Sequence, residues 1–376
     1  MNSLRVGIVG AGIVGLAYAW SAVRRGHHVS VLERHPRASG ASIRNFGMIW
    51  PIGQPAGQLY DTAMASRERW LELSRSAGVW VNPCGSLHLA YHDDELTVLR
   101  EFAAAADDLR IACEWIGPAE VIARSPAANP TGLLGGLASS TELCVNPRTA
   151  VDQIAAWLRS TLGVQFHFDT LATSVQPGTL CSADSRRWDF DRIIVCGGAD
   201  IDTLFPACNR FDTRLCKLQM LRTGPQPAHW KLGPHIAGGL TLRHYRSFEV
   251  CPSLASLKQR IADQTPELDR FGIHVMASQN ELGHVILGDS HEYDGDVEPF
   301  DKEIIDQLIL RELRTIIRLP QWSVAERWHG RYAKHPELPI VRSEPLPEVH
   351  VRTGTGGAGM TLALGLAEAD WNQWSQ

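Results

Sequence analysis

The sequence predicts a two-domain α/β protein, in which a doubly wound domain made of several chain segments carries an inserted α+β domain built on a mixed antiparallel sheet. Three observations predict this fold. The chain has 376 residues, 44% of them hydrophobic, and exceeds the usual size of one domain. Glycine-rich turns follow strand-like runs at the beginning, in the middle and near the end of the chain. Two intervening segments have a denser β pattern without alternating helices.

The composition excludes several classes of partner. The net charge is -5 and only 20% of the residues are charged, so no polybasic surface for nucleic acid or membrane lipid is expected. Eight cysteines occur without a C-x-x-C motif or a spacing typical of metal sites. We therefore expect free thiols, no metal and a cytoplasmic location, while the oligomeric state stays open.

The N-terminal segment is predicted to form a βαβ unit. The run 6–9 is strand-like, and the apolar residues that follow it lie on one face of a helix that ends near Arg24, Arg25 and Gly26. The run 28–32 is a second strand. The two arginines come too early for a membrane span, which needs about 20 uncharged residues.

The glycines of this unit, Gly10, Gly12 and Gly15, form a G-x-G-x-x-G motif between strand and helix. Gly10 permits the tight turn, Gly12 lets a pyrophosphate approach the backbone, and Gly15 allows close packing of helix and strand. Free N–H groups at the helix start attract phosphate. Glu33 follows the second strand near the spacing, about 20 residues, at which an acid accepts hydrogen bonds from a ribose. The unit therefore predicts a Rossmann-type dinucleotide site.

The remaining elements follow in order along the chain. A helix at 67–76 ends at Gly78, and Asn146-Pro147 begins a helix that continues to about 162. A strand at 190–195 leads into Gly197-Gly198. The later pattern predicts strands at 215–221, 240–250, 273–277, 284–287 and 349–352, helices at 301–318 and from 360, and a glycine-rich turn at 354–359.

These elements give the predicted domain organisation. The dinucleotide-binding domain comprises 1–85, 144–212 and 323–376, because these segments carry the glycine-rich turns. The inserted substrate-binding domain comprises 86–143 and 213–322.

Several stretches resemble a known family. They are GIVGAGIVGLAYA and LER in the first unit, GASIRNFGM at 40–48, VNPRTAV at 145–151, DRIIVCGGA at 191–199, and WHGRYAKHPELPIV at 328–341 followed by GTGGAGMTLALGLAE. Over nearly the whole chain they are similar to the FAD-dependent family of D-amino-acid oxidase, glycine oxidase and sarcosine oxidase, the DAO family. GASIRNFGMIWPIGQP and ILGDSHEY resemble a narrower branch proposed to act in phosphonate catabolism, on aminophosphonates. The resemblance implies that the first domain is a glutathione-reductase-like FAD-binding domain.

The resemblance also implies where FAD binds. We expect noncovalent FAD, because no cysteine follows Cys251 to form the thioether found in some relatives. The ADP half would lie at the first glycine turn, above Gly197 and Gly198, and the ring between 44–48 and the C-terminal turn, where the last helix would stabilise the reduced flavin. Val175 would contact adenine through its backbone. The expected cofactor-binding residues are Gly10, Gly12, Ile13, Val14, Gly15, Glu33, Arg34, Ala41, Ser42, Arg44, Asn45, Phe46, Gly47, Met48, Val175, Gly197, Gly198, Gly330, Gly356, Gly357, Gly359, Met360 and Thr361.

The expected function is an FAD-dependent amine oxidase. A neutral amine would donate hydride from the carbon beside nitrogen to flavin N5, the imine would hydrolyse, and dioxygen would be reduced to hydrogen peroxide. The favoured substrate is a small anionic amine, 2-aminoethylphosphonate or its N-methyl form. Four alternatives stay open. They are oxidation of glycine, sarcosine or a D-amino acid; an FAD dehydrogenase with another electron acceptor; an NAD-dependent dehydrogenase, which would share the first βαβ unit; and a flavin-carrying protein without turnover.

The preference for a phosphonate depends on one departure from the family pattern. Glycine oxidase-like members bind the substrate carboxylate with an arginine two residues after the glycine of W-x-G. Here the motif is Trp328-His329-Gly330, that position holds Tyr332, and Arg331 stands one residue earlier, on the opposite face of an extended strand. In the expected strand at 240–250, His244 and Arg246 face away from Tyr245. No catalytic residue is assigned, and the expected substrate-binding residues are Arg44, Trp50, Gln54, His244, Tyr245, Arg246, His291, Trp328, Arg331 and Tyr332.

Overall fold

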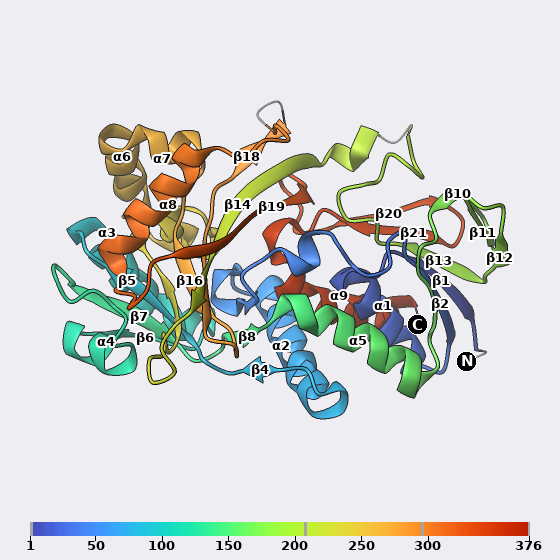
Figure 1. The fold of residues 1–376 in the computed structure, drawn as a ribbon, viewed down its shortest axis with the longest axis horizontal. Helices are drawn as coiled ribbons and strands as arrows, with labels where there is room; N and C mark the ends of the chain where they lie inside the picture. The colour runs from blue at the N-terminus through green and yellow to red at the C-terminus, as the bar shows by residue number, and fades with distance from the viewer. Residues whose placement is uncertain (1–2, 207–208, 295–296, 375–376) are drawn as a thin grey trace.

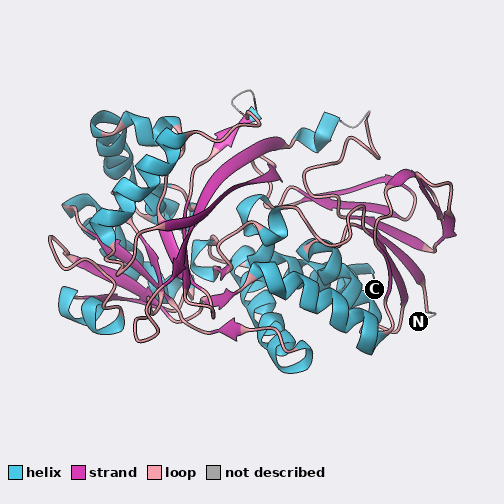
Figure 2. Ribbon diagram, viewed as in Figure 1, coloured by secondary structure: helices cyan, strands magenta, loops and turns pink. Residues whose placement is uncertain are grey.

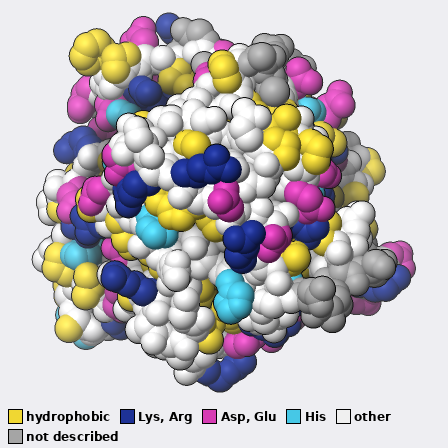
Figure 3. All heavy atoms as spheres, turned by 90° about the vertical axis from the view of Figure 1, so that its right-hand side faces the viewer, with side chains coloured by type: hydrophobic (Ala, Val, Ile, Leu, Met, Phe, Trp, Pro, Cys, Tyr) yellow, Lys and Arg dark blue, Asp and Glu magenta, His cyan; other side chains and the backbone are white. Residues whose placement is uncertain are grey.

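The computed structural model describes residues 3–206, 209–294 and 297–374. Two large sheets lie one after the other along the long axis of the molecule, and both chain ends lie beside the smaller sheet (Figure 1). One group of helices lies between the two sheets, and a second group lies beside the larger sheet (Figure 2). On the end of the molecule that faces the viewer in Figure 3, basic and acidic side chains are intermixed.

A six-stranded sheet contains the predicted βαβ unit. Its order is β20-β21-β13-β1-β2-β9, and all its strands are parallel except β20, which pairs antiparallel with β21. The strands are β1 (Arg5–Val9), β2 (His28–Leu32), β9 (Gln165–His167), β13 (Arg192–Val195), β20 (Val341–Leu346) and β21 (Val349–Thr353). The sheet therefore joins chain segments from the beginning, middle and end of the sequence, as the glycine-rich turns predict.

Four helices share an apolar core with this sheet. α1 packs against α5 and α9, and α2 packs against α9, around a buried cluster that includes Leu16, Trp70 and Trp371. The helices are α1 (Ile13–Val23), α2 (Gln58–Ala77), α5 (Pro147–Leu162) and α9 (Gly359–Trp374). Two small sheets complete this part of the fold: β10 (Ala172–Gln176), β11 (Thr179–Ser182) and β12 (Arg187–Asp189), and β3 (Met48–Ile49), β8 (Leu143–Val145) and β4 (Val81–Asn82).

The larger sheet has nine strands and confirms the predicted mixed antiparallel sheet. Its order is β18-β14-β17-β16-β15-β5-β7-β6 with β19 also paired to β14, and only β15 and β5 are parallel to each other. The strands are β5 (Ser86–Ala90), β6 (Cys113–Ile116), β7 (Gly135–Ser139), β14 (Arg214–Pro225), β15 (His235–Ala237), β16 (Met276–Gln279), β17 (His284–Gly288), β18 (Glu292–Tyr293) and β19 (Val324–Lys334). The helices beside it are α3 (Asp93–Leu109), α4 (Pro118–Arg124), α6 (Leu254–Gln264), α7 (Pro266–Arg270) and α8 (Glu303–Ile316).

Local capping signals explain the helix boundaries that were predicted correctly. The Asn146 side chain accepts a hydrogen bond of 3.2 Å from the Arg148 N–H, so it caps α5 as expected. Gly78 ends α2 with a left-handed φ of +67°. The predicted start of this helix at 67 is wrong, because α2 begins at Gln58. The strand predicted from 273 begins at Met276.

The strand predicted at 240–250 is wrong. The segment forms two short 3-10 helices, Gly239–Arg243 and Arg246–Val250. Their backbone groups bond within the segment, as in the 3.0 Å bond from the His244 N–H to the Thr241 carbonyl, so no partner strand is needed. The predicted alternation of side chains therefore does not hold for this segment.

The domain boundaries stay a prediction, and one of them divides a sheet. A boundary between 322 and 323 separates β19 from β14, to which β19 pairs over its whole length. The described cysteines are free thiols, and Cys208 lies outside the described residues. Among the described helices, none combines the length and the apolar character that crossing a bilayer requires.

Candidate active site

Segments of both large sheets line one cavity of about 600 Å³. Its size lies within the range of about 300–1,000 Å³ that is typical of small-molecule and cofactor sites. One end is formed by the first glycine turn and the ends of β2 and β13, and the other end by residues of the nine-stranded sheet and the 3-10 helices near Tyr245. The lining includes residues 9–10, 12–14, 32–35, 38–42, 44–46, 53–55, 170–172, 196–200, 244–246, 330–339 and 352–362.

The first glycine turn leaves room for a ligand at the start of α1. Gly10 has a φ of +99°, which a side chain rarely permits, and a Cβ on Gly15 would lie 1.9 Å from the Gly10 carbonyl oxygen. Gly12 precedes the helix, and a Cβ there would lie 3.0 Å from the Ser42 Oγ. That hydroxyl accepts a hydrogen bond of 2.9 Å from the Ile13 N–H. The turn before the helix is thus lined by glycines and a serine hydroxyl, and it is polar, as a phosphate site requires.

Glu33 lies beside this turn at the end of β2. Its carboxylate accepts hydrogen bonds from the Ala11 N–H at 2.9 Å and the His35 N–H at 3.1 Å. Arg34 forms an ion pair of 2.6 Å with Asp200, which follows β13. Glu33 is therefore fixed at the cavity wall, and the Arg34–Asp200 pair joins two strand ends across this end of the cavity.

The segment 44–48 is held in place by its own polar groups. Asn45 donates from Nδ2 to the carbonyls of Ala41 and Ser42, each at 3.0 Å, and accepts at Oδ1 from the Gly47 N–H at 2.8 Å. Farther along the chain, the Trp50 N–H donates to the Thr361 Oγ1 at 2.9 Å. The chain just after this segment is thereby joined to the start of α9.

The C-terminal glycine turn brings a second helix start to the cavity. Gly356 has a φ of +56°, and Gly356–Ala358 form a 3-10 helix that leads into α9. Gly356, Gly357 and Gly359 line the cavity, and the first turn of α9 carries no acidic side chain. The positive end of the helix dipole therefore faces the same cavity as the start of α1.

The comparison with known families follows this geometry. A family model with the description "DAO: FAD dependent oxidoreductase" matches residues 5–369. The chain belongs to the DAO family of FAD-dependent oxidoreductases. Its cofactor is therefore FAD, and the alternative of an NAD-dependent dehydrogenase does not hold.

The chain is also similar to individual proteins. Over 130 residues the chain is 30% identical to one chain of the anaerobic glycerol-3-phosphate dehydrogenase of Escherichia coli strain K12, a match that covers 35% of this chain and 24% of the relative. The match thus spans about a quarter of that curated relative. Two solved structures share the fold: glycine oxidase from Geobacillus kaustophilus has a TM-score of 0.77 at 16% identity, covering 100% of this chain and 95% of that chain. L-Proline dehydrogenase from P. horikoshii has a TM-score of 0.77 at 17% identity, and the match covers 100% of this chain and 94% of that chain.

The residues present fit FAD. The polar, glycine-lined start of α1 suits the pyrophosphate, and the Glu33 carboxylate beside it can accept hydrogen bonds from a ribose. The start of α9 suits the end of the flavin ring that becomes negative on reduction. When bound, FAD supplies the group that accepts hydride from a substrate.

Most of the predicted site residues line the cavity. They are Gly10, Gly12, Ile13, Val14, Glu33, Arg34, Ala41, Ser42, Arg44, Asn45, Phe46, Met48, Trp50, Gln54, Gly197, Gly198, His244, Tyr245, Arg246, His291, Gly330, Arg331, Tyr332, Gly356, Gly357, Gly359, Met360 and Thr361. This shared cavity is what a site for cofactor and substrate together requires, although Arg246 and Arg331 are exposed on its border.

Four predicted residues lie outside the lining. Gly15 packs against the Gly10 carbonyl, and a Cβ on Gly47 would lie 2.0 Å from the Val145 carbonyl oxygen, so both positions serve close backbone packing. Val175 is buried in an apolar cluster, and the cavity is instead lined by 170–172. Trp328 donates from its indole N–H to the Arg44 carbonyl at 3.2 Å, so it supports the cavity wall from behind.

Among the lining residues that were not predicted as site residues are His274, Asp289 and Lys334. Lys334 alternates with Gly330 and Tyr332 along β19, so the period of two in the strand was a usable signal. His274 and Asp289 lie in segments that flank β16 and β17, and no local pattern distinguishes them.

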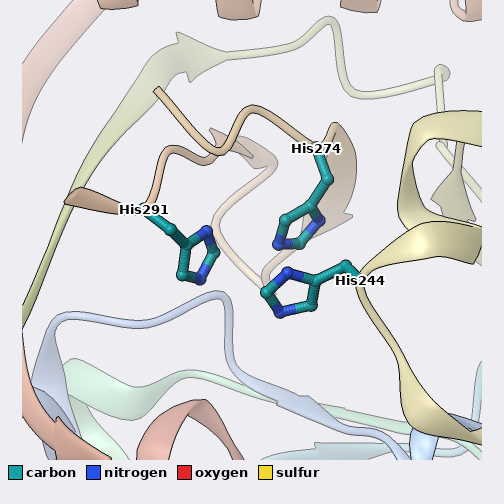
Figure 4. A group of neighbouring side chains, drawn as sticks. All are labelled: His244, His274 and His291. Atoms are coloured by element: carbon teal, nitrogen blue, oxygen red, sulfur yellow. The ribbon is translucent and has the colours of Figure 1, made fainter. Parts of the chain in front are cut away.

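Three histidines meet at the end of the cavity near the nine-stranded sheet (Figure 4). The ring centroids of His244 and His274 lie 3.9 Å apart, those of His244 and His291 4.5 Å, and those of His274 and His291 5.0 Å. Burial is the main cause that lowers the pKa of His291 to about 4, against the opposing effect of Asp289 and together with that of His274. Burial and the two neighbouring imidazoles hold the pKa of His244 well below its usual value. These two rings are therefore neutral near pH 7.

Proposed function

We propose that the protein oxidises a small anionic amine and prefers an aminophosphonate, such as 2-aminoethylphosphonate or its N-methyl form, to an amino acid. The observation that carries this proposal is a set of cations on the cavity wall. Arg44, Arg331 and Lys334 line the cavity, and none of them forms an ion pair with the part of the chain that the structure describes. A phosphonate carries up to two charges, so it gains more from several donors than a carboxylate does.

Tyr332 supports the same preference. It takes the position at which glycine oxidase-like members carry the arginine for the substrate carboxylate, and it is buried at the cavity wall. Burial holds the pKa of its phenol well above the usual value, so the hydroxyl stays protonated and can donate a hydrogen bond. A neutral donor replaces a bidentate cation here, which weakens the case for a simple carboxylate substrate.

The task of the other residues is to position the amine and exclude water, because hydride transfer from a neutral amine needs little acid-base assistance. Arg44 donates to the His329 carbonyl at 3.2 Å, which restrains its guanidinium at the cavity. Trp50 and Tyr245, with ring centroids 6.2 Å apart, form an apolar wall. Gln54 is buried beside them and offers a neutral amide.

Dioxygen is the proposed electron acceptor, with hydrogen peroxide as the product. Lys334 is the one lysine among the described lining residues, and its charge would favour reduction of dioxygen in the same cavity. A dehydrogenase with another acceptor is the alternative. The free thiols support a reducing compartment, and we propose the cytoplasm.

A second candidate is oxidation of glycine, sarcosine or another small amino acid. It is favoured by the names of the solved structures that share the fold, glycine oxidase and L-proline dehydrogenase. In this case Arg44 or Arg331 would have to bind the substrate carboxylate, because Tyr332 carries no positive charge.

Flavin reduction under anaerobic conditions tests the proposal. The holoenzyme is mixed with 2-aminoethylphosphonate, its N-methyl form, glycine or sarcosine, and loss of flavin absorbance is followed with time. All four amines are compared at the same low concentration. We expect the faster of the two phosphonates to reduce the flavin at least about tenfold faster than either amino acid. This ratio of rates corresponds to about 1.4 kcal/mol, which we attribute to the extra charge of the phosphonate. If glycine or sarcosine reduces the flavin and neither phosphonate does, the preference for a phosphonate is contradicted. Oxidation of a small amino acid is then the function that is left.

A further inference from the structure

We propose that His244, His274 and His291 form a binding site for one divalent metal ion of the Zn²⁺ type. One ligand atom from each side chain lies within 4.8 Å of the other two. The three residues come from separate segments: His244 lies between the two 3-10 helices, His274 precedes β16, and His291 lies between β17 and β18. All three rings point into one space (Figure 4).

The surroundings of the rings are those of a metal site. The His291 Nδ1 lies 3.3 Å from the Gly272 carbonyl, to which it can donate, and this leaves Nε2 as the free ligand atom. The His274 Nε2 lies 3.0 Å from the Asp289 Oδ1, so this carboxylate lies beside the cluster. A backbone carbonyl is a usual outer partner of a metal-binding histidine, since it fixes which ring nitrogen carries the proton.

The cluster also contains polar atoms that lack a hydrogen-bond partner. Both ring nitrogens of His274 and the Asp289 Oδ1 are buried without a hydrogen bond among the described residues, because the close His274–Asp289 approach is poorly aligned for one. A buried polar group without a partner costs about 1–3 kcal/mol. A metal ion bound at one ring nitrogen of His274 would remove part of this cost.

The ligand set favours Zn²⁺ or a similar borderline ion. Neutral imidazoles are ligands for zinc, copper, nickel and iron. Zinc bonds to nitrogen of about 2.0–2.1 Å place tetrahedral ligands about 3.3 Å apart, so the nitrogens must move closer than they now stand. His244 is only half-buried and its ring is stacked on His274, so rotation of this side chain can provide that movement.

The site would act on substrate through an open coordination position. The three histidines and Asp289 line the same cavity as Arg44 and Lys334. A zinc ion with three protein ligands keeps a fourth position for water or another oxygen ligand. This role, which rests on the proposed function, is to bind an oxygen of the substrate phosphonate.

Metal content of the holoenzyme tests the site without reference to activity. The FAD-loaded enzyme is treated with a chelator, dialysed against Zn²⁺ at graded concentrations, and analysed for zinc and flavin per chain. We expect one zinc per chain in the wild type and at least about tenfold weaker binding in His244→Gln and His291→Gln, because each loses one ligand. His229→Gln, at an exposed histidine outside the cavity, is the matched control and should bind zinc as the wild type does.

Flavin content shows which variants are folded, and the half-buried His244→Gln remains informative if His291→Gln loses FAD. Failure of the wild type to retain zinc, or unchanged zinc affinity in His244→Gln, would overturn the metal site. In a second arm, methylphosphonate is titrated into the enzyme with and without zinc, and the change in flavin absorbance is followed. We expect at least about fivefold tighter binding with zinc, and equal affinity would overturn the role in substrate binding. The amine panel described above reports separately on the proposed function.

Discussion

The Thr361 hydroxyl at the start of α9 accepts a hydrogen bond of 2.9 Å from the buried Trp50 N–H. This contact joins the two segments that face each other at the expected position of the flavin ring. Thr361→Val keeps the shape and removes the acceptor, so the Trp50 N–H loses its partner at a cost of about 1–3 kcal/mol. We expect a lower melting temperature and FAD affinity reduced about five- to tenfold, since the spacing of the two segments is no longer fixed. Thr97→Val, at an exposed hydroxyl on α3, should change neither quantity in the same FAD titration.

The close approach of Gly15 to Gly10 makes a second prediction. A Cβ on Gly15 would lie 1.9 Å from the Gly10 carbonyl oxygen, so Gly15→Ala must push α1 away from the glycine turn. Such overpacking costs about 1–3 kcal/mol or more, and we expect most of the protein to be purified without FAD. Gly117→Ala is the control, because a Cβ there meets no atom within 4 Å. Normal flavin content in Gly15→Ala would refute the packing role of this glycine.

Glu33 should determine affinity for FAD without affecting the fold. Its carboxylate is held by two backbone N–H groups beside the cavity, and Glu33→Gln replaces one acceptor oxygen with a donor. Hydrogen bonds to a charged group contribute about 1.5–3 kcal/mol, so we expect FAD to bind at least about tenfold more weakly. The dissociation constant of the deflavo-protein for FAD measures this, with the exposed Glu68→Gln as control. Equal affinity in the two variants would mean that Glu33 does not contact the cofactor.

Arg44 should bind substrate. Arg44→Gln keeps a hydrogen-bond donor but removes the positive charge from the cavity wall. A hydrogen bond to a charged group contributes about 1.5–3 kcal/mol. We therefore expect the dissociation constant of the substrate to rise about 10- to 100-fold. The concentration dependence of anaerobic flavin reduction gives that constant. Arg37→Gln, whose side chain is 73% exposed, should behave as the wild type. A variant with normal substrate affinity would remove Arg44 from the proposed site.

A buried ion pair should stabilise the FAD-binding sheet. Asp370 accepts hydrogen bonds from Arg352 at 2.5 Å and from the Tyr18 hydroxyl at 2.5 Å, and the Asp370 and Arg352 side chains are only 4% and 6% exposed. Asp370→Asn leaves the Arg352 charge buried without its counter-ion, which costs about 3–5 kcal/mol. Denaturant unfolding should show this loss, whereas the exposed Asp108→Asn should change stability by less than about 0.5 kcal/mol. A loss below about 1 kcal/mol in Asp370→Asn would contradict the structural role.

The first βαβ unit was predictable because its signals are local. Gly10, Gly12 and Gly15 are required by a turn whose backbone approaches itself closely, and Glu33 follows at the spacing that the second strand imposes. The cap at Asn146 is also a contact over two residues. Such features depend on neighbouring residues alone, so the sequence contains them in full.

The substrate end of the cavity was less predictable because it depends on tertiary contacts. The apolar pattern of 240–250 fits a strand as well as two 3-10 helices, and burial of Leu240, Leu242 and Phe248 decides between them. His274 gave no signal of its own, because its partners His244 and His291 lie in other segments. Trp328 was expected in the cavity, but its indole points to the Arg44 carbonyl.

Two helix starts and the cations of the nine-stranded sheet share one cavity, which we propose to hold one noncovalent FAD and an anionic amine. This is tested by counting the flavin that acid releases from the purified enzyme and by measuring flavin reduction with N-methyl-2-aminoethylphosphonate in the absence of oxygen. We expect about one FAD per chain in the acid supernatant and full loss of the flavin absorbance on addition of this amine. Flavin that stays in the protein pellet, or flavin that stays oxidised with this amine and with 2-aminoethylphosphonate, would show that the cavity does not have this role.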